Sequence, residues 1–177
     1  MIKTLKPILI VLFLVVGIVA IFLSMSTKQN MITLFEGNIE KKPIDIILNH
    51  FQDSDCGMVI DKIDYASQVI APDGKTWFFH DHGGMVKWLE TKPFKDKAII
   101  WVHSLDTNKW IDAREAYYTR DEETPMKYGF GAYSKNSTNR IPFKEMQLLM
   151  LRGETMANPT IRRQLLKSKE KESHGDH

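Results

Sequence analysis

The sequence YASQVIAPDGKTWFF, residues 65–79, decides how the middle of the chain folds. Residues 65–70 and 76–79 are rich in β-branched and aromatic side chains, which favour strands. Between them stands Pro72-Asp73-Gly74, a turn sequence because proline fixes φ and glycine accepts a positive φ. The stretch therefore predicts a β-hairpin.

A helix is predicted directly after this hairpin. Asp81 is a favoured N-cap residue, and Met85 and Leu89 stand four positions apart, so their side chains share one helical face. Pro93 ends the helical pattern. Residues 65–93 therefore predict one strand–strand–helix unit.

The second half of the chain repeats this order. Strand-like runs occupy residues 98–102, 110–111, 116–118 and 130–133. A helix then carries Phe143, Met146 and Met150 on one side and closes at Gly153. The sequence therefore predicts an α+β fold of two ββα-like halves, and the pattern suggests an internal duplication.

Both flanks of this region have weaker patterns. Helical spacing predicts a short amphipathic turn or helix that ends before Asp53 and Asp55; its apolar positions are Ile44, Ile47, Leu48 and Phe51. The two aspartates are expected to be solvated loop residues. After Asn158-Pro159, residues 161–166 predict a short helix, and the charged residues 167–177 predict a disordered tail.

The N-terminal run is apolar. Residues 7–27 are 21 residues without a charge, and at ~1.5 Å per residue such a helix crosses a hydrocarbon core of ~30 Å. A cleaved signal peptide and an uncleaved signal anchor are both compatible with this run; the anchor is favoured because residues 23–26 are a poor cleavage site. Lys3 and Lys6 precede the run, so the N-terminus is expected in the cytoplasm and the rest of the chain outside the cytoplasmic membrane, on its periplasmic or extracellular side.

These patterns divide the chain into four predicted segments. Residues 1–27 form the anchor, 28–43 a linker, 44–153 the folded domain and 154–177 a charged tail. With 177 residues, 43% of them hydrophobic, the chain has room for one ordinary domain plus attachments. The net charge is only +2, and the basic residues are scattered along the chain or lie at its two ends, so they form no basic stripe for binding nucleic acid. The single cysteine excludes an intramolecular disulfide and a C-x-x-C zinc or redox motif.

Soft donor atoms gather in two short stretches. Cys56 and Met58 stand two positions apart, which places both sulfurs on one face of an extended segment. His80, His82 and Met85 follow downstream. Thiolate, thioether and imidazole donors suit Cu(I) better than they suit magnesium or calcium. The alternative is that Cys56 is a small buried apolar residue and Met58 part of the core.

Several elements resemble the NosL family, the accessory copper proteins of nitrous oxide reductase maturation. The similarity lies in the Cys-Gly-Met element at residues 56–58, the Ala66-x-Gln68 strand, the Asp73-Gly74 turn, the His80-Asp81 and Met85 segment, and Met126 followed by residues 129–133. It covers roughly residues 45–153. Family members are commonly lipoproteins, and some carry a further cysteine shortly before the Cys-Gly-Met element, where this chain has Asp53 or its neighbours.

The resemblance implies a small domain that binds Cu(I) and transfers it, with Cys56 and Met58 as ligands, Met126 as a candidate third ligand, and Met85, His80 and His82 as further candidates. Its implied partners are a copper-maturation ABC-type membrane complex and an apo-cuproenzyme such as nitrous oxide reductase. The leading hypothesis is therefore a membrane-anchored Cu(I) chaperone without catalytic activity. The alternatives are a structural module of the same fold that binds no metal, and a thiol-based redox protein that uses Cys56.

Overall fold

The structure, a computed structural model, describes residues 2–25 and 31–174 of the chain. The chain divides into two units, residues 1–31 and 32–177. The first contains α1 (Ile2–Met25), whose large apolar side chains between Ile10 and Ile21 are 50–78% exposed. Among the residues that the structure describes, no helix is both long enough and apolar enough to span a membrane.

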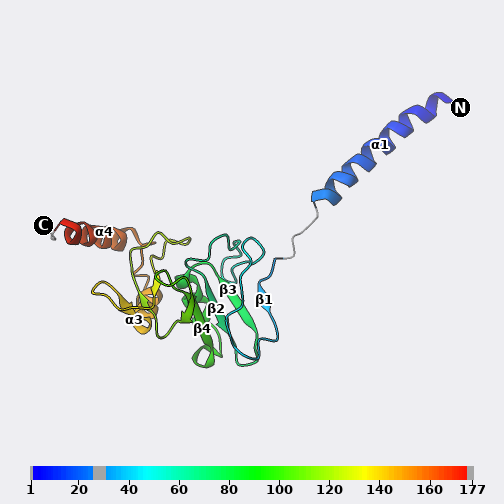
Figure 1. The fold of residues 1–177 in the computed structure, drawn as a ribbon. Helices are drawn as coiled ribbons and strands as arrows, with labels where there is room; N and C mark the ends of the chain where they lie inside the picture. The colour runs from blue at the N-terminus through cyan, green and yellow to red at the C-terminus, as the bar shows by residue number, and fades with distance from the viewer. Residues whose placement is uncertain (1, 26–30, 175–177) are drawn as a thin grey trace. The chain divides into compact units, whose positions relative to one another are not determined.

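The second unit is mixed α+β and contains two antiparallel sheets (Figure 1). The larger sheet has the order β1-β3-β2-β4-β5. Its strands are β1 (Leu34–Phe35), β2 (Ser67–Ile70), β3 (Thr76–Phe79), β4 (Ile99–His103) and β5 (Trp110–Asp112). The predicted hairpin is confirmed as β2 and β3, which are joined by a turn in which Gly74 has a φ of +84°. The strand predicted at residues 98–102 is confirmed as β4, which pairs with β2 and β5.

The smaller sheet has three short strands in the order β7-β6-β8. They are β6 (Tyr117–Tyr118), β7 (Ala132–Tyr133) and β8 (Ile141–Pro142). A 3-10 helix (Lys95–Lys97) precedes β4, and the α-helices of this unit are α2 (His82–Glu90), α3 (Phe143–Leu151) and α4 (Pro159–His174).

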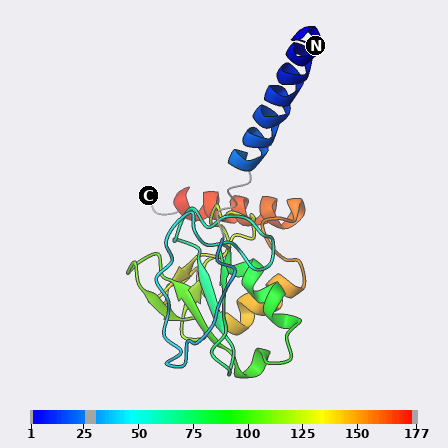
Figure 2. The same cartoon turned by 90° about the vertical axis from the view of Figure 1, so that its right-hand side faces the viewer.

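The main core lies between the large sheet and two helices. α2 packs on β2 and β3, and α3 packs on α2 and the small sheet; Figure 2 shows both helices on the same side of the strands. Buried side chains from all these elements meet there, among them Val69, Phe79, Met85, Val102 and Met146. The predicted start of α2 and the predicted end of α3 are confirmed: Asp81 caps α2 by accepting a hydrogen bond from the Gly83 amide, and Gly153 follows α3 with a φ of +71°.

The sheet topology departs from two separate halves. The order of strands followed by a helix recurs in β2-β3-α2 and in β6-β7-β8-α3. However, β4 and β5 extend the first sheet, because Ser67 to Ile70 of β2 pair with β4 on one side and with β3 on the other. The boundary that the sequence pattern suggested near residue 98 therefore runs through the middle of one sheet.

Of the turn or helix predicted for residues 44–51, the structure contains the turn, at residues 48–50, where the His50 amide donates to the Ile47 carbonyl at 3.1 Å, and no helix. Asn49 has a φ of +64°, which a helix excludes, and the Ile44 amide donates to Gln68 Oε1 at 2.8 Å. Ile32 and Phe51 form an isolated parallel bridge instead. The apolar spacing is used in a second, small core of Phe51, Ile60 and Phe78, against which Ile44 and Ile46 pack.

Both predicted attachments of the domain contain ordered structure. β1, within the predicted linker, forms one edge of the large sheet by pairing with β3. The C-terminal helix α4 continues to His174, where a disordered tail was predicted from residue 167. Lysine and glutamate are good helix formers, the Asn158 side chain accepts a hydrogen bond from the Thr160 amide at the start of α4, and Lys169 pairs with Asp121 at 2.7 Å.

Candidate metal centre

A tight loop at residues 53–58 presents Cys56. The Asp53 amide donates to the Met58 carbonyl at 2.8 Å, and the Gly57 amide donates to the Asp53 carbonyl at 2.9 Å. Gly57 has a φ of +74°, which only glycine adopts readily, so this residue allows the loop to turn back. Cys56 is a free, exposed thiol at the tip of this turn.

The Asp53 side chain holds the same loop from inside. Its Oδ1 accepts hydrogen bonds from the Asp55 amide at 2.7 Å and the Cys56 amide at 3.0 Å. Aspartate side chains commonly satisfy amides two and three residues ahead in this way. The carboxylate therefore fixes the backbone that carries the thiol.

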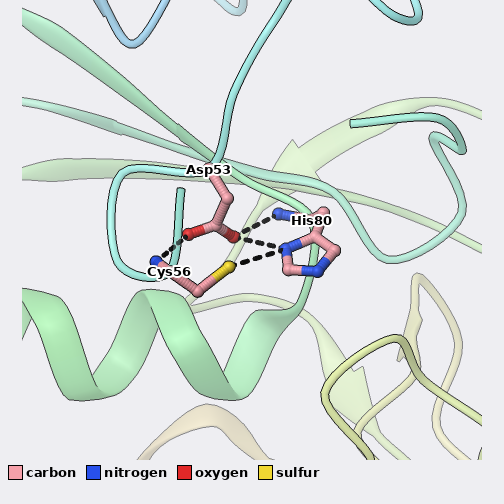
Figure 3. Close-up of side chains that lie close together, drawn as sticks. All are labelled: Asp53, Cys56 and His80. Atoms are coloured by element: carbon pink, nitrogen blue, oxygen red, sulfur yellow. Dashed lines mark hydrogen bonds and ion pairs between the residues drawn. The ribbon is translucent and has the colours of Figure 1, made fainter. Parts of the chain in front are cut away.

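His80 comes to this loop from the end of β3. Its own amide donates to Asp53 Oδ2 at 2.9 Å, and its Nδ1 lies 2.5 Å from the same oxygen. Cys56 Sγ lies 3.9 Å from His80 Nδ1. Figure 3 shows the imidazole turned toward both the carboxylate and the sulfur. The three side chains place their possible ligand atoms within 4.8 Å of one another.

The spacing between sulfur and nitrogen fits a bridging metal ion. Zinc, for example, binds cysteine sulfur at ~2.3 Å and imidazole nitrogen at ~2.0 Å, so one ion spans at most about 4.3 Å between the two atoms. The observed 3.9 Å lies within that limit. Cys56 and His80 can therefore hold one ion with a bent sulfur–metal–nitrogen angle, provided that the ion displaces the Nδ1 proton that faces Asp53 in the metal-free protein.

The electrostatics of the cluster favour an ion pair beside a protonated thiol. Burial raises the pKa of Asp53, but hydrogen bonds from His80, Cys56 and Asp55 outweigh burial and lower this pKa below its ordinary value. Burial lowers the pKa of His80, but Asp53 outweighs burial and raises it. Burial and the charges of Asp53 and Asp55 raise the pKa of the Cys56 thiol. Metal binding must displace protons from the thiol and the imidazole, so it should tighten as the pH rises.

Asp53 was missed by the sequence-based interpretation, which treated it as solvated. It is buried, at 2% exposure, and four N–H groups already bond its two oxygens. Asp55 is also partly buried, and pairs with Lys87 at 3.5 Å. The signal that was available is an aspartate three residues before the cysteine, the spacing of a side-chain-capped turn.

Two of the remaining candidates lie at the surface. Met58 is 43% exposed, in the loop that carries Cys56. Met126 is partly exposed, and its amide donates to Asp81 Oδ2 at 2.9 Å. Asp81 directly follows His80 in the chain. Asp81 Oδ1 also accepts from Gly83, so one carboxylate fastens the Met126 loop to the start of α2.

The other two candidates lie in the interior. Met85 is fully buried and packs in the main core. His82 is fully buried, and its Nδ1 lies 2.7 Å from Ser67 Oγ. The structure therefore brings Cys56 and His80 together and adds Asp53, but does not bring Met85 or His82 into that cluster.

The fold and the site thus define a class, an α+β domain with a candidate metal centre of aspartate, cysteine and histidine. No protein-family model matches the chain, and no curated protein matches it.

The buried His82 should make the protein sensitive to acid. Burial, and repulsion from His103, lower the pKa of His82 to about 3. The other groups in contact with the imidazole are the Ser67 hydroxyl and the rings of Tyr65 and Tyr118. An unfolded histidine has a pKa of about 6.5. The contribution of neutral His82 to stability is therefore complete above pH ~6.5 and falls by about 1.4 kcal/mol per pH unit as the pH drops toward 3.

The measurement is urea unfolding of the metal-free protein between pH 7 and 5. In the variant His82→Asn, the amide oxygen can accept a hydrogen bond from Ser67. The unfolding free energy of this variant should depend less on pH, by about 1.4 kcal/mol per pH unit, which corresponds to one proton. The exposed His50→Asn is the matched control and should retain the wild-type slope. Equal slopes in the wild type and His82→Asn would contradict the assignment.

Proposed function

We propose that this protein is a metal carrier that binds one Cu(I) ion through Cys56 and His80 and passes it to a partner. The observation that supports this most directly is an exposed thiol 3.9 Å from a buried imidazole that a buried carboxylate orients. Thiolate and imidazole suit Cu(I), and the preceding carboxylate positions both groups.

The exposure of the site suits transfer rather than storage. Cys56 and Met58 both lie at the surface, so an incoming donor from a partner can reach the ion before Cys56 leaves. Met58 and Met126 are the thioethers that we propose as additional ligands during this exchange. Such ligand exchange needs no catalytic step, and we propose that the protein is not an enzyme.

Two other functions remain as outcomes of the tests. A thiol redox protein would need a lowered thiol pKa, whereas burial and nearby carboxylates raise the pKa of Cys56. A site of aspartate, cysteine and histidine also suits Zn(II). A module without any metal would bind neither ion.

The proposal is tested by titrating the full-length protein with Cu(I) against a chromophoric chelator, and with Zn(II) in parallel. We expect one tight Cu(I) per chain. Asp53→Asn should weaken Cu(I) binding by about 10–100-fold, because Asp53 bonds the backbone amides of both Cys56 and His80 and so positions the two ligands, and loss of such partners has effects of that size. Asp55→Asn, two residues away, is the matched control and should change affinity little. Tighter binding of Zn(II) than of Cu(I) at pH 7, or no tight Cu(I) at all, would reject the copper assignment.

We also propose that the apolar N-terminal run, residues 7–27, anchors the protein in the cytoplasmic membrane, with the rest of the chain on the periplasmic or extracellular side. This proposal rests on the sequence, because no helix among the described residues is long and apolar enough to span a membrane. The absence of charges from residues 7–27 supports it. In intact cells the mature protein should begin at Met1 and fractionate with membranes. A mature N-terminus near Ser26 would contradict the anchor.

The family resemblance of the sequence supports the proposed partners. They are a copper-maturation ABC-type membrane complex and an apo-cuproenzyme of the nitrous oxide reductase kind. Deleting this chain in its own organism should leave such an enzyme synthesised but short of copper, measured by metal analysis of the purified enzyme. A full copper content of the enzyme purified from the deletion strain would show that this enzyme does not depend on the protein for its copper.

A further inference from the structure

A hollow of about 530 Å³ lies directly beside the loop that carries Cys56. Ser54 and Gly57, which lie on either side of Cys56 in the chain, line one wall. Trp77 and Trp88 line it from β3 and α2, and Leu34 of the edge strand β1 closes the other side. The hollow therefore lies beside the loop that carries the proposed metal ligand, although Cys56 and His80 are not among the residues that line it.

The walls of the hollow have two chemical properties. The rings of Trp77 and Trp88 are partly exposed, with centroids 5.1 Å apart. Aromatic rings of this kind attract thioether sulfur. The Lys92 ammonium lies over the Trp88 ring, 4.2 Å from its centroid, which places a cation at the rim.

The two charged side chains among the described residues that line the hollow have opposite signs and differ in exposure: Asp53 is 2% exposed, whereas Lys92 is partly exposed. Both oxygens of Asp53 are already bonded by four N–H groups. Lys92 is thus the charge that a ligand meets, and it favours an acidic partner.

Three exposed apolar side chains belong to the hollow or to the loop beside it: Leu34 lines the hollow, and Met58 and Val59 follow the lining residue Gly57. Of the eleven exposed large apolar residues described outside α1, eight lie between residues 32 and 59, and Leu34, Met58 and Val59 are among them. Apolar surface around a reactive group is typical of a protein-docking site.

We propose that this hollow docks an extended, acidic segment of the metal-receiving protein that carries methionine or histidine donors. The proposal rests on the function proposed above. The methionine side chain would lie on the tryptophan rings, its flanking carboxylates would face Lys92, and its neighbouring donor would reach the ion on Cys56. The hollow would thereby select acceptors by charge.

The test uses the full-length protein in detergent, loaded with one Cu(I). Two synthetic acceptors are compared, Glu-Met-Glu-Met-Glu-His and Lys-Met-Lys-Met-Lys-His, both acetylated and amidated. Transfer is followed by loss of the thiolate-to-copper absorption in a stopped-flow instrument. We expect transfer to the acidic peptide to be about tenfold faster, because rim charges act mainly on association rates.

Three variants decide whether Lys92 is responsible. Lys92→Glu should abolish the preference for the acidic peptide, and Lys92→Arg should retain it, while the Cu(I) affinity of both stays at the wild-type value. Lys109→Glu, the same charge reversal in the exposed turn before β5, is the matched control and should retain the preference. An unchanged preference in Lys92→Glu, or its loss in Lys109→Glu, would overturn the proposal.

Failure of the copper proposal can be told apart from failure of this one. If no tight Cu(I) binds, titration of the metal-free protein with the acidic peptide still tests the hollow through tryptophan fluorescence, with Lys92→Glu as the negative variant. Vesicles of phosphatidylcholine and phosphatidylglycerol are titrated in parallel. A fluorescence change with vesicles but not with the acidic peptide would make the surface a lipid contact and overturn the proposal.

Discussion

Replacing Cys56 with serine should weaken Cu(I) binding by more than ~100-fold. Mutation of a residue that only positions a metal ligand typically weakens binding by about 10–100-fold, and loss of a ligand itself should cost more. A neutral oxygen replaces an anionic sulfur of similar size, and Cu(I) prefers the sulfur. The side chain is exposed, and the loop beneath it is held by Asp53 and Gly57 rather than by the thiol. The unfolding free energy of the metal-free protein should therefore change by less than ~0.5 kcal/mol.

Met58→Leu is the companion variant, measured for the same two quantities. It retains the volume and removes only the thioether, and its side chain is 43% exposed. If Met58 is a ligand, Cu(I) affinity should fall while the unfolding free energy stays constant. An unchanged Cu(I) affinity in Met58→Leu would remove Met58 from the site, whereas an unchanged affinity in Cys56→Ser would end the carrier proposal.

Gly83→Ala should be the most destabilising small substitution near the site. An added Cβ at Gly83 would lie 2.6 Å from Cδ2 and 2.7 Å from Cβ of Tyr128. These atoms are at the base of the ring, so Tyr128 cannot move aside by a rotation alone. Overpacking of this kind costs about 1–3 kcal/mol, which urea unfolding measures directly.

Gly84→Ala provides the matched control, since it is the next residue of the same helix. Its added Cβ would lie 3.8 Å from Asp55 Oδ2, an ordinary contact. Alanine is a better helix former than glycine by up to ~1 kcal/mol, so this variant should be neutral or more stable. Equal destabilisation by the two variants would contradict the assignment of the effect to Tyr128.

The two glycine variants also probe the thioether of Met126. Met126 is two residues from Tyr128 and is fastened to Asp81 by its amide. Displacement of Tyr128 in Gly83→Ala should therefore shift Met126 as well. If Met126 is a copper ligand, Gly83→Ala should bind Cu(I) more weakly than Gly84→Ala does.

The local elements of the fold could be predicted because their signals are local. The Pro72-Asp73-Gly74 turn and the strands on either side define the hairpin, and Asp81 caps α2 as its residue type predicts. The pairing of β4 with β2 could not be read from the sequence. Strand pairing across 30 residues is decided by how buried faces fit together, and a residue pattern repeated in two halves does not contain that information.

The absence of a helix at residues 44–51, where the structure has only a turn, has a similar cause. Apolar residues at helical spacing occur there, but Gln68 bonds the backbone of Ile44 on both sides, through its amide oxygen and its amide nitrogen. A buried glutamine on β2 therefore takes the hydrogen bonds that a helix would make internally. Tertiary contacts of this kind override local propensity.

The sequence predicted the donor residues of the candidate site, but it did not predict the residue that positions them. Soft donor chemistry directed attention to Cys56 and His80, which the structure brings together. Asp53 carries a carboxylate, a hard ligand that a search for soft donors passes over. Its role in holding the Cys56 loop and His80 depends on its burial, which the sequence does not reveal. Met126 was suggested only by the family resemblance, and its role as a ligand remains a prediction.

The segment that carries Cys56 is held to the domain by few regular hydrogen bonds. Between residues 32 and 66 the regular pairing consists of β1 and two isolated bridges, Ile32 with Phe51 and Gln52 with Val59. Regions of this kind open with a lower free energy than the global unfolding free energy. The amides of Gly57 and Ile60 should therefore exchange with deuterium well before those of β2 and β4. Such local opening would give a metal ion bound at Cys56 a way out while the sheet stays folded.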